Sequence, residues 1–480
     1  MAAKNFQVIS PVDGKMFLER PLAGFEEVRA VCARARTAQP AWRGVPLDER
    51  VRLCERLVEQ FGAERDDIVA ELARQMGRPV RFGGSEVDGF AQRGLYMASI
   101  AHDALTDEEI PSARGPLGGT PGRNLVRRFI RHEPHGVVLV LAPWNYPYLT
   151  AVNSVIPALI AGNAVVLKHS DQTPLCADRI RDAATQAGIP GDVLQTLDTS
   201  HETIGQVVSE SLADFVAFCG SVAGGHAVQE AASSGFGGVG LELGGKDPAY
   251  VRADADLDFT IPRLADGAFF NSGQSCCAVE RVYAHASVYD EVVEGLVAEA
   301  SKLRLGNPLD PETTLGPMVR ISNADSVRSQ IADAIGRGAR PLVDSASFGS
   351  DTGNDACGTY LAPQVLVNVD HSMPVMRDET FGPVAGVMAV DGDDDAISLM
   401  NDSRYGLTAS VWTQDTHAAV ALGGQIECGT LFMNRCDYVD PALAWTGVKD
   451  SGRGATLSRL GFEQLTRPKS FYLNNLNNAG

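Results

Sequence analysis

The sequence has no apolar run long enough to cross a bilayer, which takes about 20 consecutive apolar residues. Its first residues, MAAKNFQVISPVDGK, lack the apolar core of a secretory signal, so we expect a cytoplasmic protein. The nine cysteines form no CxxC pair and no cluster with histidine. These absences argue against a membrane protein, a disulfide framework and a structural zinc site, and we expect no bound metal.

Basic residues are also in deficit: 41 Lys and Arg stand against 60 Asp and Glu, which gives a formal net charge of −19. This charge argues against nucleic acid and anionic membranes as partners. It does not exclude a nucleotide cofactor, because a single helix N-terminus can hold a phosphate. At 480 residues, 44% of them hydrophobic, the chain is long enough for roughly two to four structural units with a large core.

The order of apolar patterns predicts an α/β protein. The first hundred residues show mostly helical spacing. From residue 136 to 243, short apolar stretches alternate with amphipathic helices, as in a doubly wound parallel sheet. A second α/β unit follows, with a helix over 288–303 and strands over 381–390 and 409–413.

Two adjacent cysteines, Cys276 and Cys277, lie in the segment FFNSGQSCCAVERV. A thiolate is a strong nucleophile, although a free cysteine more often fills space in a core. The preceding Asn-Ser-Gly-Gln-Ser is polar and typical of a turn, so at least one thiol should be accessible. The segment thus supplies a candidate nucleophile.

A candidate base, Glu242, ends the apolar stretch VGLEL just before two glycines. Partial desolvation raises the pKa of a carboxylate and suits it to general base catalysis, although an ordinary ion pair is the alternative. The same stretch nearly matches a phosphate loop from Gly240 to Lys246. Asp247 stands where Ser or Thr would bind Mg²⁺, and Glu242 would repel a phosphate, so we reject an ATPase or kinase.

Other polar residues lie next to predicted strands, where doubly wound sheets bind their ligands. Asn145 in APWNYP follows GVVLVL, and its amide suits a developing oxyanion. Lys168 ends NAVVLK, and Glu379 precedes an apolar strand; both are placed to contact ribose hydroxyls. In FCGSVAGG, residues 218–225, backbone N–H groups at a helix start can face a pyrophosphate. A surface lysine and a plain strand-to-helix turn are the alternative interpretations.

Together these segments resemble the aldehyde dehydrogenase superfamily. APWNYP, KHSDQTP, FCGSVAGG, LELGGKDP, FFNSGQSCC, DETFGPV and GVKDSGRG occur in the family's order and span essentially the whole chain. Cys276 follows Glu242 by 34 residues, as the family's nucleophile follows its base. The resemblance implies two Rossmann-like doubly wound domains, one cofactor-binding and one catalytic, with a small β oligomerisation element. It also implies NAD(P)-dependent oxidation of an aldehyde to a carboxylic acid.

By this resemblance, Cys276 forms a thiohemiacetal and then a thioester, Asn145 donates to the oxyanion, and Glu242 activates the deacylating water. A CoA-acylating relative typically lacks this Glu, so its presence favours hydrolysis. The residues implied in cofactor binding are Trp144, Lys168, Asp171, Gly220, Ser221, Gly225, Glu379 and Phe381. An aromatic funnel over the nucleophile is implied by Tyr146, Phe270 and Trp445, with core packing as the alternative for Phe270.

Several departures from the family pattern bear on specificity. Cys219 stands where the family usually has Thr, and Trp445 and Thr446 replace the common Phe-Gly. Asp171 replaces the longer Glu of many NAD-preferring members; its charge still disfavours a 2′-phosphate, so we expect NAD, with NADP possible. Relatives that act on semialdehyde acids often carry an Arg eight residues after the oxyanion amide. Asn153 at that position favours a small uncharged aldehyde.

The resemblance also divides the chain. It places the dinucleotide-binding domain at 1–113 and 135–244, the catalytic domain at 245–450, and the oligomerisation element at 114–134 and 451–480. Family members usually form homodimers or homotetramers, and LVRRFIRHE and SFYLNN are the candidate contact strands. Three alternatives stay open: a CoA-acylating enzyme, an NADP-preferring enzyme, and a catalytically silent relative that keeps the fold.

Overall fold

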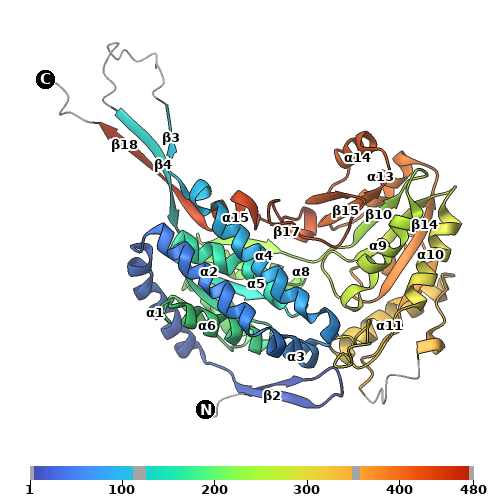
Figure 1. Cartoon of the computed structure of the whole chain (residues 1–480), viewed down its shortest axis with the longest axis horizontal. Helices are drawn as coiled ribbons and strands as arrows, with labels where there is room; N and C mark the ends of the chain where they lie inside the picture. The colour runs from blue at the N-terminus through green and yellow to red at the C-terminus, as the bar shows by residue number, and fades with distance from the viewer. Residues whose placement is uncertain (1–4, 112–125, 349–356, 475–480) are drawn as a thin grey trace.

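Two large sheets, each with helices on both faces, form the body of the molecule, and a narrow three-stranded sheet projects from one end (Figure 1). The computed structural model on which this description rests covers residues 5–111, 126–348 and 357–474. Both large sheets are mainly parallel. The α/β class predicted from the alternation of strands and helices is confirmed.

The first sheet has six strands, and its central strand β5 (Val137–Ala142) is buried along its whole length. Alternate residues of β5 enter two different hydrophobic cores, as the two-residue period of a strand requires. The sheet order is β17 (Gly452–Arg453), β9 (Gly238–Glu242), β8 (Phe215–Cys219), β5, β6 (Ala164–His169) and β7 (Leu194–Thr196). All neighbours are parallel except β17 and β9.

Helices cover both faces of this sheet. The helices that share one core are α2 (Leu47–Ala63), α3 (Arg65–Met76), α4 (Val80–Leu105), α5 (Pro147–Ala161), α6 (Pro174–Ala187) and α15 (Ser458–Gln464). Those on the other face are α1 (Phe25–Arg43), α7 (His201–Ser209) and α8 (Val222–Ala232). Thirteen of the fifteen residues of α5 are buried, because this helix is enclosed between the sheet and α4.

The expectation that the first hundred residues are mostly helical needs one correction. Residues 5–21 form an antiparallel hairpin of β1 (Asn5–Ile9) and β2 (Met16–Pro21). The hairpin contacts both halves of the molecule: Arg20 pairs with Asp178 and Asp198, while Thr359 Oγ1 donates to the Pro11 carbonyl. These contacts with distant residues hold the segment extended. The helical spacing of residues further along the chain did not predict a hairpin here.

The second sheet has seven strands in the order β12 (Arg340–Pro341), β13 (Gln364–Val367), β14 (Val384–Val390), β11 (Val279–His285), β10 (Asp247–Val251), β15 (Thr408–Trp412) and β16 (Thr430–Met433). Helices α9 (Leu257–Phe269) and α10 (Tyr289–Ser301) pack on one face. On the other face lie α11 (Ile321–Gly336), α12 (Pro374–Arg377), α13 (Asp393–Asn401) and α14 (Thr416–Gly423). The remaining short helices are η1 (Phe270–Gly273), η2 (Ser345–Phe348) and η3 (Lys449–Ser451).

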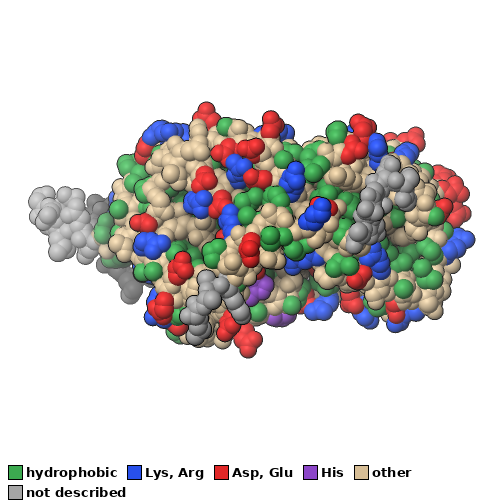
Figure 2. Space-filling model, turned by 90° about the horizontal axis from the view of Figure 1, so that it is seen from below, with side chains coloured by type: hydrophobic (Ala, Val, Ile, Leu, Met, Phe, Trp, Pro, Cys, Tyr) green, Lys and Arg blue, Asp and Glu red, His purple; other side chains and the backbone are tan. Residues whose placement is uncertain are grey.

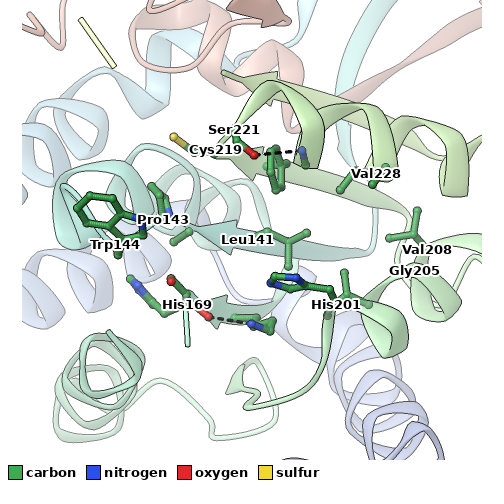
Figure 3. A pocket seen from close by; sticks show the side chains of 18 of the residues that line it. Leu141, Pro143, Trp144, His169, His201, Gly205, Val208, Cys219, Ser221 and Val228 are labelled. Atoms are coloured by element: carbon green, nitrogen blue, oxygen red, sulfur yellow. Dashed lines mark hydrogen bonds between the residues drawn. The ribbon is translucent and has the colours of Figure 1, made fainter. Parts of the chain in front are cut away.

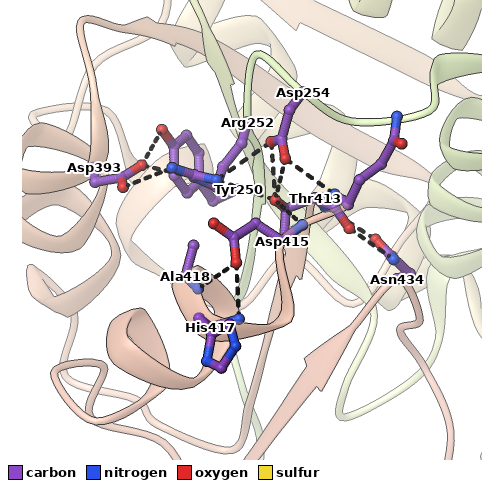
Figure 4. A network of polar contacts seen from close by, with 10 residues as sticks. Tyr250, Arg252, Asp254, Asp393, Thr413, Asp415, His417, Ala418 and Asn434 are labelled. Atoms are coloured by element: carbon purple, nitrogen blue, oxygen red, sulfur yellow. Dashed lines mark hydrogen bonds and ion pairs between the residues drawn. The ribbon is translucent and has the colours of Figure 1, made fainter.

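A polar network joins the strands and helices at one end of this sheet (Figure 4). Arg252, just after β10, donates from Nε to Asp393 at the start of α13, at 2.9 Å. Asp254 accepts a hydrogen bond of 2.7 Å from Thr413, which follows β15. The Arg252 guanidinium lowers the pKa of Asp393, so the pair stays charged near neutral pH.

The projecting sheet pairs β18 (Thr466–Asn474) with β4 (Val126–Pro134), and β4 with β3 (Glu108–Glu109). Both strands were predicted, as LVRRFIRHE and SFYLNN. The preceding β17 belongs to the six-stranded sheet instead, through its pairing with β9. The domain boundaries drawn from the sequence remain a prediction.

The molecular surface carries charged side chains of both signs. On the face seen in Figure 2, acidic and basic side chains are interspersed. Within the described ranges, no helix is long and apolar enough to cross a bilayer.

Candidate active site

A cavity of about 430 Å³ opens at the carboxyl ends of β5, β6 and β8 (Figure 3). Leu141 forms its floor, α7 contributes His201 and Val208, and α8 contributes Val228. The N-terminus of α8 points toward the cavity, and Ser221 caps it by accepting a hydrogen bond from the Gly224 N–H at 3.2 Å. A site of this kind suits an anion such as a pyrophosphate.

The end of the cavity at β6 carries a cation and a buried imidazole. Lys168 is buried, and its Nζ lies 2.8 Å from Asp171 Oδ1. Burial lowers the pKa of His169 to about 3, so the ring is neutral. Neither ring nitrogen of His169 has a hydrogen-bond partner among the described residues, and the side chain lines the cavity. An adenosine with its ribose fits this set of groups.

A second cavity, of about 220 Å³, adjoins the first and shares with it the residues Pro143, Trp144, Cys219, Gly220 and Ser221. Its walls bring together the predicted catalytic residues Cys276, Glu242 and Asn145. Glu379 and Phe381 line it too. The two cavities therefore form one path from Lys168 to the Cys276 thiol.

Cys276 follows a tight turn. Asn271, Ser272 and Gly273 all have positive φ, and a Cβ on Gly273 would lie 2.1 Å from the Gly382 carbonyl, so only glycine fits there. The Asn145 Nδ2 donates to the Gln274 carbonyl at 3.2 Å, which fixes the amide beside Cys276. The neighbouring Cys277 is buried, and its Sγ donates to Asp437 at 3.1 Å.

A buried arginine holds the backbone of this turn. Arg78, between α3 and α4, donates from Nη2 to the Asn145 carbonyl at 2.8 Å and from Nε to Asn271 Oδ1 at 3.3 Å. Its charge is balanced by Glu86, at 2.5 Å. The other oxygen of Glu86 accepts the N–H groups of Tyr148 and Leu149 at the start of α5. One ion pair thus orders the backbone at Asn145 and the start of α5.

Glu242, the last residue of β9, is the candidate base. Burial raises its pKa, while Thr456, the Arg93 guanidinium and Cys219 each act in the opposite direction. The Thr456 hydroxyl donates directly to its Oε1. Cys219, which replaces the usual Thr of the family, lies opposite Glu242 in the β8–β9 register. The raised pKa makes this carboxylate a better proton acceptor than an exposed one.

The loop before β14 is anchored by a second buried ion pair. Glu280 accepts the N–H groups of Thr380 and Phe381, and Lys246 pairs with Glu280. Lys246 is the lysine of the rejected phosphate-loop match, and the structure places it in this core. Burial and the nearby Glu280 raise the pKa of Glu379 to about 8. The Phe381 ring meets Trp144 edge-on, with centroids 5.5 Å apart.

Two of the predicted cofactor residues, Gly225 and Asp171, line neither cavity. Gly224 lines the larger cavity, whereas Gly225 packs on Leu243, whose Cδ2 a Cβ would approach to 2.7 Å. Asp171 lies behind Lys168 and is not part of either cavity wall.

The aromatic residues are dispersed. Trp445 is buried in the same core cluster against which Cys276 packs. Phe270 meets Phe82, and the Tyr146 ring lies under the Arg78 guanidinium. Within the described part of the chain, no ring contact joins Tyr146, Phe270 and Trp445, so the funnel remains a prediction.

Sequence reasoning missed the charged residues that surround the site. Arg78, Glu86 and Arg93 lie before or within α4, where helical spacing indicated only packing. Asp437, whose pKa burial raises to about 6, lies in a segment without strand or helix signal. The Gly77-Arg78-Pro79 sequence, a charged residue between two helix breakers, was the one usable signal.

Comparison with known proteins agrees with this geometry. The sequence model of the aldehyde dehydrogenase family matches residues 1–471. A probable betaine aldehyde dehydrogenase of Schizosaccharomyces pombe is 32% identical over 471 residues, covering 98% of this chain and 92% of the relative. The succinate semialdehyde dehydrogenase (NAD(P)+) of Escherichia coli is 30% identical, covering 95% of each chain.

Solved structures show the same likeness. An indole-3-acetaldehyde dehydrogenase complexed with NAD+ has a TM-score of 0.92 at 30% identity, covering 98% of this chain and 93% of that one. Three observations agree: the fold, the match over the whole chain, and a cavity path that is long enough for a dinucleotide and ends at a cysteine. This chain belongs to the aldehyde dehydrogenase family and is an NAD(P)-dependent enzyme that oxidises an aldehyde to a carboxylic acid.

Proposed function

We propose that Cys276, Asn145 and Glu242 carry out this oxidation as nucleophile, oxyanion donor and base. The observation that carries the proposal is that all three line one cavity of about 220 Å³, although they are far apart in the sequence. We also propose that 1–113 and 135–244 bind the dinucleotide and that 245–450 supply the thiol.

The first step is attack of the Cys276 thiolate on the aldehyde carbon, which gives a thiohemiacetal oxyanion. Asn145 has two amide hydrogens, and only one is used by the Gln274 carbonyl. The second is free to donate to the oxyanion, a contribution of about 3 kcal/mol for a single donor of this type. When bound, the nicotinamide dinucleotide accepts the hydride that leaves as the oxyanion collapses to a thioester.

Glu242 acts in the second step. Its carboxylate removes a proton from a water molecule, which attacks the thioester and releases the carboxylic acid and the Cys276 thiolate. The burial that raises the pKa of Glu242 makes it a stronger base than an exposed carboxylate. A CoA-acylating reaction would not need this residue.

The cofactor residues are assigned by their position along the two cavities. We place the adenosine ribose near Lys168, with Asp171 behind it, and the pyrophosphate at Gly220 and Ser221. The nicotinamide end lies between Trp144, Glu379 and Phe381, next to Cys276. Gly225 supports the turn by its packing on Leu243 rather than by contact.

Rapid mixing of an aldehyde with NAD+ tests the assignment. We expect Cys276→Ser to abolish the reduced cofactor, with a fall of at least a thousandfold in kcat. Glu242→Gln should keep an initial burst of reduced cofactor and then turn over slowly, since only deacylation is lost. Loss of the burst in Glu242→Gln would contradict its role, and normal turnover by Cys276→Ser would remove the nucleophile. Added CoA should change neither rate.

We further propose a small uncharged aldehyde as substrate. Asn153 is neutral and buried, and its Oδ1 accepts a hydrogen bond of 3.2 Å from Arg93. The positive charge of Arg93 is opposed by the nearby carboxylates of Glu86 and Glu242, so it is not free for a substrate carboxylate. Tyr146, Phe270 and Trp445 are the proposed aromatic contacts.

Kinetics with matched aldehydes decide the substrate class. Butanal should have a kcat/KM at least tenfold above that of succinic semialdehyde, which has the same carbon chain with a terminal carboxylate. The reverse order would contradict the proposal of an uncharged substrate.

We also propose a homodimer or homotetramer that is located in the cytoplasm. The projecting sheet ends in the edge strand β18, where Tyr472 and Leu473 are exposed, and such an edge can pair with another copy. All nine cysteines are free, which suits a reducing compartment.

A further inference from the structure

The wall of the larger cavity carries a second cation, which comes from the other half of the molecule. Arg320, the residue before α11, lines this cavity together with Lys168, His169 and Ser170. Lys168 is buried at the end of β6, whereas Arg320 is exposed. The adenosine end of the path therefore lies between two basic side chains of different origin.

Arg320 is held in place from one side only. Its Nε donates to Gln172 Oε1 at 2.9 Å. Gln172 is itself fixed, because its Nε2 donates to the carbonyls of Ile9 and Gln75. No described residue accepts a hydrogen bond from Nη1 or Nη2 of Arg320. These two nitrogens form a planar fork of the kind that binds phosphate through two hydrogen bonds.

The charge balance at this end favours an added anion. Lys168 and Arg320 are cavity residues. Asp171 lies outside the cavity wall and pairs with Lys168, and Asp198, on which Lys168 also acts, pairs with Arg20. Burial lowers the pKa of Arg320, and Asp171 acts in the opposite direction, so this one carboxylate faces both cations. The formal charge of Lys168, Arg320 and Asp171 is +1, which leaves room for an added negative charge.

We propose that Arg320 binds the 2′-phosphate of NADP and that this residue, with Lys168, lets the enzyme use NADP as well as NAD. The proposal rests on the proposed placement of the adenosine ribose in the larger cavity. It reverses the weight given to Asp171 from the sequence alone, where its negative charge was taken to disfavour the 2′-phosphate. Arg320 gave no signal in the sequence, because it lies about 150 residues from Lys168.

The structural alternative is that Arg320 only braces Gln172 and the hairpin through its Nε. That role needs no free Nη groups and predicts no difference between ligands with and without a 2′-phosphate. The two interpretations are separated by small ligands that carry only the adenosine half of the cofactor, so binding is measured without catalysis.

Titration calorimetry with adenosine 2′,5′-bisphosphate and with AMP provides the test. Arg320→Ala should weaken binding of the bisphosphate by about tenfold, which corresponds to about 1.4 kcal/mol. It should change the affinity for AMP by less than twofold. Arg320→Lys should recover part of the loss, since it restores the charge without the fork. The ratio of kcat/KM for NADP+ to that for NAD+ should fall by the same factor in Arg320→Ala.

Arg337→Ala is the matched control, because Arg337 is an exposed arginine at the opposite end of α11. It should leave both affinities unchanged. An unchanged affinity of Arg320→Ala for the bisphosphate, or an equal loss for both nucleotides, would overturn the proposal. Binding of neither nucleotide by the native enzyme would also overturn it. These measurements do not depend on Cys276 or Glu242, so failure of the catalytic assignment would be seen separately.

Discussion

At the scale of single residues, the site is governed by a small set of buried charges. Arg78 and Arg93 are opposed by Glu86 and Glu242, so two cations and two carboxylates share one desolvated region. Burial of each charge alone is costly, but a balanced set keeps its members ionised. Glu242 is the member that we propose as the base, and its pKa reflects both burial and the Arg93 cation.

The pH dependence of turnover should respond to Arg93. Removing its charge in Arg93→Gln raises the pKa of Glu242, because the cation that stabilises the carboxylate is lost. The folded-state pKa is already above the ordinary value, and the change moves it further up, so the acidic limb of the kcat profile shifts to higher pH. Lost hydrogen bonds to the Leu149 carbonyl and to Asn153 should also cost about 1–3 kcal/mol of stability.

Steady-state profiles of kcat against pH, with thermal melting of each variant, check this expectation. Arg74→Gln, an exposed arginine on α3, serves as the control for a lost surface charge. A profile of Arg93→Gln that coincides with the native one would show that Arg93 does not set the pKa of Glu242.

At the scale of elements, the site depends on the close approach of two backbone segments: the linker between β9 and β10 and the segment around Cys276. The linker between β9 and β10 passes close to Cys276 and Glu379: a Cβ on Gly245 would lie 2.4 Å from the Cys276 carbonyl, and one on Gly244 would lie 2.2 Å from Glu379 Oε1. Only glycine leaves room for these approaches. Gly245, which completed the rejected phosphate-loop match, thus serves the packing of the linker against the segment that carries Cys276.

The proposed homo-oligomer can be tested at the edge strand β18. Changing its exposed Tyr472 and Leu473 to lysine should shift the native oligomer toward the monomer, since charged side chains disfavour pairing at a sheet edge. Light scattering after gel filtration measures the mass. Lysine at the exposed Val420 on α14, on the far side of the molecule, is the control. A native protein that is monomeric at micromolar concentration would contradict the proposed oligomer.

Local sequence patterns predicted the strands and helices whose conformation follows from the spacing of their own apolar residues. The apolar stretches of β5, β6, β8 and β9 and the helices between them follow from two-residue and helical spacing. The hairpin β1–β2 does not, because its extended form depends on contacts with residues more than 150 positions away, such as Asp178 and Asp198. Non-local contacts of this kind leave no periodic signal.

At the scale of the whole molecule, the order of motifs predicted the fold and the residues that the smaller cavity brings together. Cys276, Glu242 and Asn145 stood out because each lies at a strand end or in a turn with an unusual chemical neighbourhood. Arg93 and Arg320 did not, since a charged residue on or next to a helix is ordinarily a solvated one. Only the tertiary structure shows that Arg93 acts on Glu242 and that Arg320 lines the larger cavity.

The amino-terminal hairpin contacts both halves of the molecule. It is fastened to the first through Arg20 and to the second through the carbonyls of Pro11 and Val12, which accept hydrogen bonds from Thr359 and Tyr360. The hairpin therefore bridges the two halves of the molecule, although it belongs to neither large sheet. Part of what joins the cofactor side to the thiol side thus comes from the first twenty residues of the chain.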